Sequence, residues 1–163
     1  MKKTRKKETA LPLAQAIIKG IQEKKGQEIV CLDLTKINRT ICDYFIICHG
    51  DSHRQVQAIS DSIIKEVQKT TGEKPWHSEG IQNSEWVLMD YVNVVAHVFL
   101  KEMRGFYNLE GLWADAEIIK IPENSILKIK DEKKRTYKKG SALVRKKREK
   151  SGILKNKKVS SKR

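Results

Sequence analysis

Asp90 and His97 are the residues of this chain whose types and spacing come nearest to acid–base chemistry. If Val92 and Asn93 form a two-residue hairpin turn, Leu88 pairs with His97 across the two strands. Asp90 and His97 then lie diagonally on one face, close enough to share a hydrogen bond directly or through water. No nucleophile or cofactor site accompanies them. We therefore interpret them as a structural polar pair and predict no catalytic residue.

A second candidate for chemistry is the turn formed by Gly50, Asp51 and Ser52, between a strand-like run and the start of a helix. Free backbone N–H groups and the helix dipole favour anions at such a place. One glycine is a weak signal, however, and the Asp51 carboxylate adds negative charge where a phosphate would sit. We favour an ordinary capped turn, with a metal-dependent nucleotidyltransferase as the alternative that this turn motivates.

Metal chemistry has little support in the sequence. Nucleotidyl transfer needs clustered carboxylates to hold divalent ions, and no second carboxylate stands near Asp90 on either strand of the hairpin. The spacings of the histidines and cysteines match no zinc-ligand pattern. Cys31, Cys42 and Cys48 lie in apolar runs without a C-x-x-C pair, which is typical of reduced core cysteines in a cytosolic protein. We therefore predict no metal and no cofactor.

The residues from the hairpin onward are unusually rich in aromatic side chains. One face of the hairpin is an ordinary apolar core face, whereas the other mixes aromatic and ionisable groups. Helices and strands elsewhere already supply an aliphatic core, and added Trp, Tyr and Arg near one edge is the composition of a protein-binding hot spot. We favour a binding interface over plain core packing for this cluster, which comprises Trp86, Phe99, Met103, Arg104, Phe106, Tyr107, Leu109 and Trp113.

The elements that must position these residues indicate an α/β domain with a mixed sheet and packed helices. A capping box at Ser52 and Gln55 begins one helix, and Gly72 ends it. The predicted elements, in order, are a helix over 9–25, strands over 28–34 and 44–48, a helix over 52–71, a loop over 73–84, the hairpin, a short helix over 102–107 and a last short element over 112–121.

The net charge of +14 is unevenly distributed. Basic side chains concentrate in residues 1–8 and 123–163, whereas residues 9–122 are mildly acidic. This predicts a basic N-terminal arm, one globular domain, and a Lys/Arg-rich tail that we expect to be disordered. Basic tails on a near-neutral domain are typical of electrostatic tethers, so an RNA-binding protein that acts through its tails is a further alternative.

The sequence contains neither a membrane-spanning apolar run nor a secretory signal, so we expect a cytoplasmic protein without a membrane partner.

The segment SEWVLMDYVNVVAHVFLKEMRGFYNLEGLWADA resembles the ribosomal silencing factor family (Iojap-like, RsfS). The runs DYFII and CHGDSHRQV agree with it, as does Glu79-Gly80 before the Trp, so that the resemblance covers about residues 10–121. It implies a nucleotidyltransferase-like core that lacks the catalytic carboxylates. It also implies binding to the large ribosomal subunit through ribosomal protein L-fourteen. The bound factor would block association with the small subunit and repress translation under nutrient limitation.

The resemblance also implies which residues form the contact surface. Two departures from the family pattern are the Val92-Asn93 turn, where Gly-Asp is usual, and Gly105 and Gly111, which replace charged residues and would loosen the contact helix. The added tail over 123–163 would contact ribosomal RNA, and exposed aromatic residues would suit a homodimer. The implied contact residues are Trp86, Arg104, Phe106, Tyr107, Leu109, Leu112 and Trp113, with Asp90 and His97 as a supporting polar pair.

Overall fold

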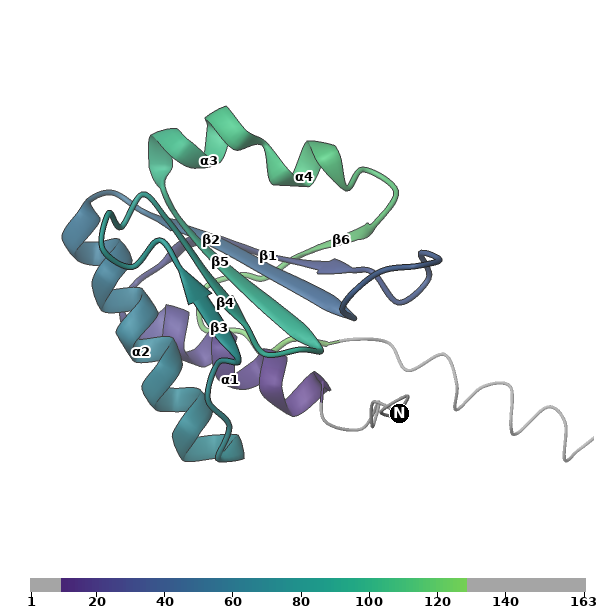
Figure 1. The fold of residues 1–163 in the computed structure, drawn as a ribbon, viewed down its shortest axis with the longest axis horizontal. Coiled ribbons are helices and arrows are strands. Elements are labelled where there is room, and N and C mark those ends of the chain that lie inside the picture. The colour runs from purple at the N-terminus through teal and green to yellow at the C-terminus, as the bar shows by residue number, and fades with distance from the viewer. Residues whose placement is uncertain (1–9, 129–163) are drawn as a thin grey trace, which may run out of the picture. The chain divides into compact units, whose positions relative to one another are not determined.

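The structure is a computed structural model that describes residues 10–128 (Figure 1). Two long helices and two short ones pack on a sheet, and the predicted mixed α/β class is confirmed. In chain order the elements are α1 (Ala10–Glu23), β1 (Gln27–Asp33), β2 (Tyr44–Gly50), α2 (His53–Thr71), β3 (His77–Glu79), β4 (Trp86–Asp90), β5 (Val94–Leu100), α3 (Lys101–Tyr107), α4 (Leu109–Leu112) and β6 (Glu117–Lys120).

The sheet has six strands in the order β3-β4-β5-β2-β1-β6. The central strands β2 and β5 run parallel, and the other neighbouring strands pair antiparallel. Both edge strands were missed by the sequence prediction. Strand β3 lies inside the predicted loop, and β6 lies inside the last element, to which no type was assigned. Both are short and largely exposed, so neither carries the apolar alternation that marks a half-buried strand.

Helices α1 and α2 cover one face of the sheet, and α3 and α4 cover the opposite face (Figure 1). Gly20 lets the two long helices approach closely, because a Cβ atom there would lie 2.8 Å from the Ile63 Cα atom. The α2 caps are those predicted: Ser52 Oγ accepts from the Gln55 N–H, and Gly72 ends the helix at φ 72°. The capping box is not reciprocal, however, because the Gln55 side chain accepts from the Asp51 N–H.

A buried cluster fills the space between the sheet and α3–α4. Its outer wall consists of partly buried side chains, among them Trp86, Met103 and Trp113. Because this face of the sheet is covered by short helices, its apolar residues form a second core in addition to the one under α1 and α2. The buried members are Val30, Leu32, Leu34, Cys42, Phe45, Ile47, Val95, Phe99, Leu109 and Ala116.

The β4–β5 hairpin has the predicted register. Its turn is unusual, because Val92 has φ 74° and the Asn93 N–H donates to the Tyr91 carbonyl at 2.9 Å. A β-branched residue at positive φ is strained. Asp90 Oδ1 accepts from the Val92 N–H at 2.7 Å, which holds the turn in place. The register therefore survives a turn that differs from the primed turns favoured in hairpins.

The domain continues past the predicted boundary at Pro122. The Gln22 side chain donates to the Ser125 carbonyl at 3.1 Å, and Leu127 is buried. The compact unit ends at Leu127, so the segment after Pro122 packs with α1 instead of belonging to the tail. The predicted arm over 1–8 and nearly all of the predicted tail lie outside the described residues. Among residues 10–128, no helix is long and apolar enough to cross a membrane.

Candidate functional site

The helical segment that follows β5 presents three apolar side chains to solvent. Phe106 is 79% exposed, Leu112 is 76% exposed and Tyr107 is 44% exposed. We call these three residues the α3–α4 surface. Helix α3 buries none of its residues, and Leu109 is the buried residue of α4. Clustered exposure of large apolar side chains marks interaction sites on soluble proteins.

The aromatic rings of this surface continue into the second core. Tyr107 packs on Trp86 with ring centroids 4.7 Å apart, and Trp86 stacks on Phe99 at 5.0 Å. Phe106 meets Tyr107 edge to face at 5.2 Å. Because each ring rests on the next, Tyr107 is held rigidly and in turn supports Phe106. A rigid aromatic residue loses little conformational freedom when a partner covers it.

The predicted contact surface therefore divides into exposed and packed residues. Leu109 is only 8% exposed, and Trp113 packs edge to face on Phe45 within the second core. Trp86 is also partly buried in that core. These three side chains contribute to the packing of the second core, so the predicted contact residues are not equally exposed. The physical reason is that α3 and α4 are too short to be seated without apolar anchors of their own.

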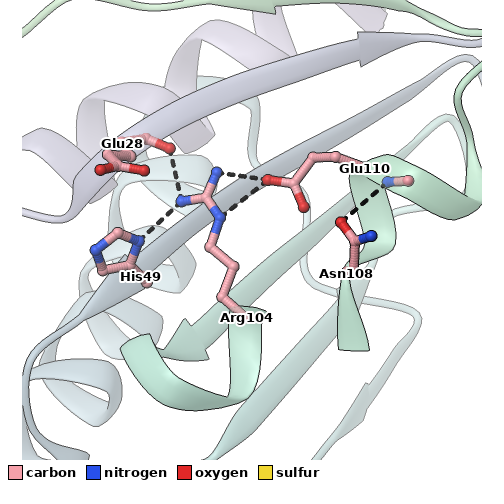
Figure 2. A network of polar contacts seen from close by, with 6 residues as sticks. Glu28, His49, Arg104, Asn108 and Glu110 are labelled. Atoms are coloured by element: carbon pink, nitrogen blue, oxygen red, sulfur yellow. Dashed lines mark hydrogen bonds and ion pairs between the residues drawn. The ribbon is translucent and has the colours of Figure 1, made fainter. Parts of the chain in front are cut away.

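Arg104 is the centre of a polar network beneath the surface (Figure 2). Its Nε and Nη2 atoms both donate to Glu110 Oε1, at 2.9 and 2.7 Å. Its Nη1 atom donates to the Glu28 carbonyl at 2.8 Å and lies 2.9 Å from His49 Nδ1. The Arg104 side chain is only 10% exposed. The Arg104 side chain therefore joins elements within the domain, whereas the sequence prediction placed it at the partner surface.

His49 must accept the contact from Arg104, because a guanidinium group can only donate. The Nδ1 atom is therefore unprotonated, and the ring is neutral. Burial lowers the pKa of His49 below its usual value, and the Arg104 charge lowers it further. A protonated ring would place two donors against each other at this contact. The neutral form and the geometry thus agree.

Asp90 and His97, which were predicted to lie within hydrogen-bonding reach directly or through water, share no direct hydrogen bond. Asp90 accepts from the Val92 N–H in the turn, while His97 Nδ1 accepts from Trp86 Nε1 at 3.2 Å. His97 Nε2 is buried without a hydrogen-bond partner. Burial lowers the pKa of His97 to about 3, so that the ring is neutral at physiological pH. Each residue supports a different part of the hairpin, and their diagonal positions do not bring them together.

The other candidates for chemistry have ordinary structural roles. In the Gly50-Asp51-Ser52 turn, the Asp51 N–H donates to the Gln55 side chain and Ser52 Oγ caps α2, so N–H groups that a phosphate would need are already bonded. All three cysteines are buried, and burial raises the pKa of Cys31 and Cys48 to about 12. Within residues 10–128, no group of His, Cys, Asp and Glu side chains is arranged to hold a metal ion.

Sequence reasoning missed Glu28, His49 and Glu110 as partners of Arg104. A buried charge needs partners, but Arg104 follows Lys101 and Glu102 in a polar stretch, so nothing in the local sequence marks it as buried. The chain separations are 55 residues to His49 and 76 residues to Glu28, so no local pattern could have identified them. Glu110 is close in sequence but lies beyond the break between α3 and α4. That break is at Asn108, which adopts φ 43°.

The fold and this surface define a small α/β domain with an exposed apolar helical face. Comparison with known families gives the class a name: the chain belongs to the RsfS family, "Ribosomal silencing factor during starvation", whose model matches residues 7–151. This is a family of regulatory proteins that silence ribosomes, which implies the ribosome as partner.

Individual relatives agree with the family assignment. The chain is 40% identical over 109 residues to ribosomal silencing factor RsfS of Halalkalibacterium halodurans, covering 67% of this chain and 92% of that protein. It is 44% identical over 96 residues to the Bacillus subtilis RsfS, covering 59% and 80%. A crystal structure from Bacillus halodurans superimposes with a TM-score of 0.57 at 38% identity, covering 67% of this chain and 97% of the other.

Proposed function

We propose that this protein binds the large ribosomal subunit through ribosomal protein L-fourteen and blocks association with the small subunit. The observation that carries the proposal is the exposed α3–α4 surface on a member of the ribosomal silencing family. Steric blocking requires a tight, correctly oriented contact and no catalytic group. Repression of translation under nutrient limitation, in the cytoplasm, follows from the resemblance described above.

Phe106 and Leu112 are the proposed anchors of the contact. Each exposes about three quarters of its area in the free protein, so each has much apolar surface to remove from water when a partner binds. Tyr107 adds a half-exposed ring that is already fixed by Trp86. Anchors of this kind account for most of the binding energy in protein interfaces. The division into anchors and packed residues also selects which substitutions test binding without disturbing the fold.

The test is sedimentation of purified protein with large subunits, followed by addition of small subunits. Phe106→Ala and Leu112→Ala should each raise the Kd by about 30-fold or more, which corresponds to about 2 kcal/mol for a hot-spot residue. Both should restore joined ribosomes. Because both side chains are exposed, each variant should keep its free energy of unfolding within about 0.5 kcal/mol. Trp86→Ala is a poor probe, since it would also disrupt the second core.

Trp76→Ala is the matched control. The Trp76 side chain is 78% exposed. It lies beside β3, at the end of β4 that is farther from α3, where the Trp76 backbone N–H donates to the Asp90 carbonyl. Loss of a large exposed aromatic side chain there should leave subunit binding unchanged. If the Phe106 and Leu112 variants bind as well as the wild type, or if all three variants weaken binding alike, the α3–α4 surface is not the contact.

We further propose that the basic residues beyond the described domain contact ribosomal RNA beside this surface. Removing residues 129–163 should reduce the slope of log affinity against log salt, because fewer counterions are released on binding. Retention of salt-insensitive binding would support the domain as the principal contact, whereas complete loss would support the alternative of an RNA-binding protein that acts through its tail.

A homodimer formed through the same apolar surface is tested by sedimentation equilibrium of the wild type and Phe106→Ala.

A further inference from the structure

Few buried apolar residues attach the α3–α4 surface to the sheet. Helix α3 contributes no buried residue, and Leu109 is the buried residue of α4. The remaining apolar support comes from partly buried Met103 and Trp113 and from Tyr107, which packs on Trp86. A helix of seven residues followed by one of four is too short to be stable by itself in water. The orientation of Phe106 and Leu112 therefore depends on specific polar contacts to the sheet as well as on this packing.

Arg104 supplies contacts to three separate elements. It joins α4 through Glu110, the start of β1 through the Glu28 carbonyl, and the end of β2 through His49 (Figure 2). The Glu28 carbonyl is available because β1 is irregular there: Glu28 has φ 45°, and the register with β2 shifts between Gln27 and Val30. A bulge of this kind redirects a backbone group away from the strand ladder. The start of β1 thus offers an acceptor that a regular strand would use within the sheet.

The junction between the two helices is also fixed by side-chain contacts. Asn108 adopts φ 43°, and its Oδ1 atom accepts from the Gly111 N–H at 3.3 Å (Figure 2). The Arg104 carbonyl accepts from the Asn108 N–H at 3.0 Å. One residue therefore ends α3 with its carbonyl and ties α4 to the sheet with its guanidinium group. Phe106 lies two residues after Arg104 in the same helix, so any tilt of α3 moves it.

We propose that Arg104 is the positioning residue of the α3–α4 surface: it seats α3 and α4 on the start of β1 and the end of β2, and so sets the direction in which Phe106 is presented. This inference rests on the proposed function, in which Phe106 contacts the ribosome. Arg104 itself does not touch the partner, because its side chain is almost covered in the free protein. A lysine cannot replace it, since an ammonium group is a single point charge without the planar fork that reaches three acceptors.

Amide hydrogen exchange of the free protein tests the seating without any ribosome. Arg104→Lys should raise exchange at the Asn108, Leu112 and Trp113 amides by about tenfold or more, because charge-assisted contacts to the sheet are lost. Amides of β2 and β5 should be unaffected. Unchanged exchange in α3–α4 would overturn the proposal. An equal rise throughout the domain would also overturn it, since that would show a general loss of stability.

A double-mutant cycle then connects the seating to binding. If Arg104 acts by placing Phe106, the Kd changes of Arg104→Lys and Phe106→Ala should not multiply, and the double variant should bind about as weakly as the weaker single variant. Independent, multiplying effects would overturn the proposal. If Phe106→Ala alone does not change binding, the proposed function fails, whereas the exchange experiment still decides whether Arg104 seats the helices.

Lys19→Gln is the matched control for a general loss of stability. Lys19 pairs with the buried carboxylate of Glu66 on the α1–α2 side of the sheet, so its loss also removes the partner of a buried charge. This variant should lower the melting temperature without changing the exchange of α3–α4 or the Kd for large subunits. If Lys19→Gln weakens binding as much as Arg104→Lys does, binding follows overall stability and the positioning role is refuted.

Discussion

Gly105→Ala should stabilise the protein, although the substitution lies in the proposed binding helix. Gly105 is in the interior of α3, it is exposed, and a Cβ atom at this position would meet nothing within 4 Å. Glycine in a helix interior is less favourable than alanine by about 1 kcal/mol, because its unfolded backbone has more freedom to lose. No steric term opposes the gain here. The sequence suggested that Gly105 loosens the contact helix. Because the space around Gly105 is open, alanine can replace it and remove this effect.

The expected size of the effect is about 0.5–1 kcal/mol in the free energy of unfolding. Urea titration followed by circular dichroism measures it, with an expected rise of about 2–5 °C in Tm as a second reading. Exchange of the Asn108 amide, which is bonded to the Arg104 carbonyl, should slow because α3 opens less often. The added methyl group is small and lies beside Phe106, so a more ordered helix should bind large subunits at least as tightly.

Gly20→Ala provides the opposite case within the same protein. It has the same gain in helix propensity, but its Cβ would lie 2.8 Å from the Ile63 Cα and 3.0 Å from the Ile63 backbone nitrogen. Separating α1 from α2 should destabilise by about 1–3 kcal/mol before the propensity gain is subtracted. A destabilised Gly105→Ala, or a Gly20→Ala variant as stable as the wild type, would refute the reasoning that local space decides the sign.

Three further predictions concern the sheet and its second core. Gly80→Ala should lower the free energy of unfolding by about 2–5 kcal/mol in urea titration. The reason is that Gly80 has φ 77° and that the new Cβ atom would lie 1.9 Å from the Trp86 carbonyl oxygen. A loss below about 1 kcal/mol would contradict this prediction. Trp86→Phe keeps a ring but removes the donor to His97 Nδ1, so thermal unfolding should show a loss of about 1–3 kcal/mol; full stability would mean that the hydrogen bond contributes nothing. Burial lowers the pKa of His97 to about 3. The stabilising contribution of the neutral ring is therefore complete above the unfolded-state pKa near 6.5. It is lost as the pH falls from there towards 3, by up to about 1.4 kcal/mol per pH unit. Urea titrations at pH 7, 6 and 5 should show a shallower decline for His97→Gln than for the wild type.

The fold was predictable where local signals were strong. The α2 helix is bounded by Ser52 and Gly72, whose capping chemistry depends only on neighbouring residues. The hairpin register followed from placing the turn at Val92 and Asn93, and it holds even though Val92 adopts a conformation that disfavours valine. The edge strands β3 and β6 were not predictable in the same way. Their pairing with β4 and β1 is provided by the neighbouring strands and not by a pattern of their own.

The candidate site was predictable as a segment but not residue by residue. Composition pointed to the region from Trp86 to Trp113, and the exposed anchors Phe106 and Leu112 do lie there. Composition cannot separate a residue that packs on the sheet from one that faces solvent, so Leu109 and Arg104 were assigned to the surface with the others. The role of Arg104 depends on acceptors from β1 and β2, which only the tertiary fold brings together.

The exposure of Phe106 follows from the way α3 is turned on the sheet. Met103 and Tyr107 are four residues apart and share one face of α3, which packs against the second core through Met103 and against Trp86 through Tyr107. In the structure α3 is turned so that Tyr107 packs on Trp86 while Phe106, about 100° away around the helix, faces solvent. Rotating α3 to bury Phe106 would detach Tyr107 from Trp86 and move Arg104 away from the Glu28 carbonyl. This orientation leaves the Phe106 ring outside, where solubility alone would favour a polar residue. That an aromatic ring stands in this place is the strongest physical reason to assign the α3–α4 surface to a binding partner.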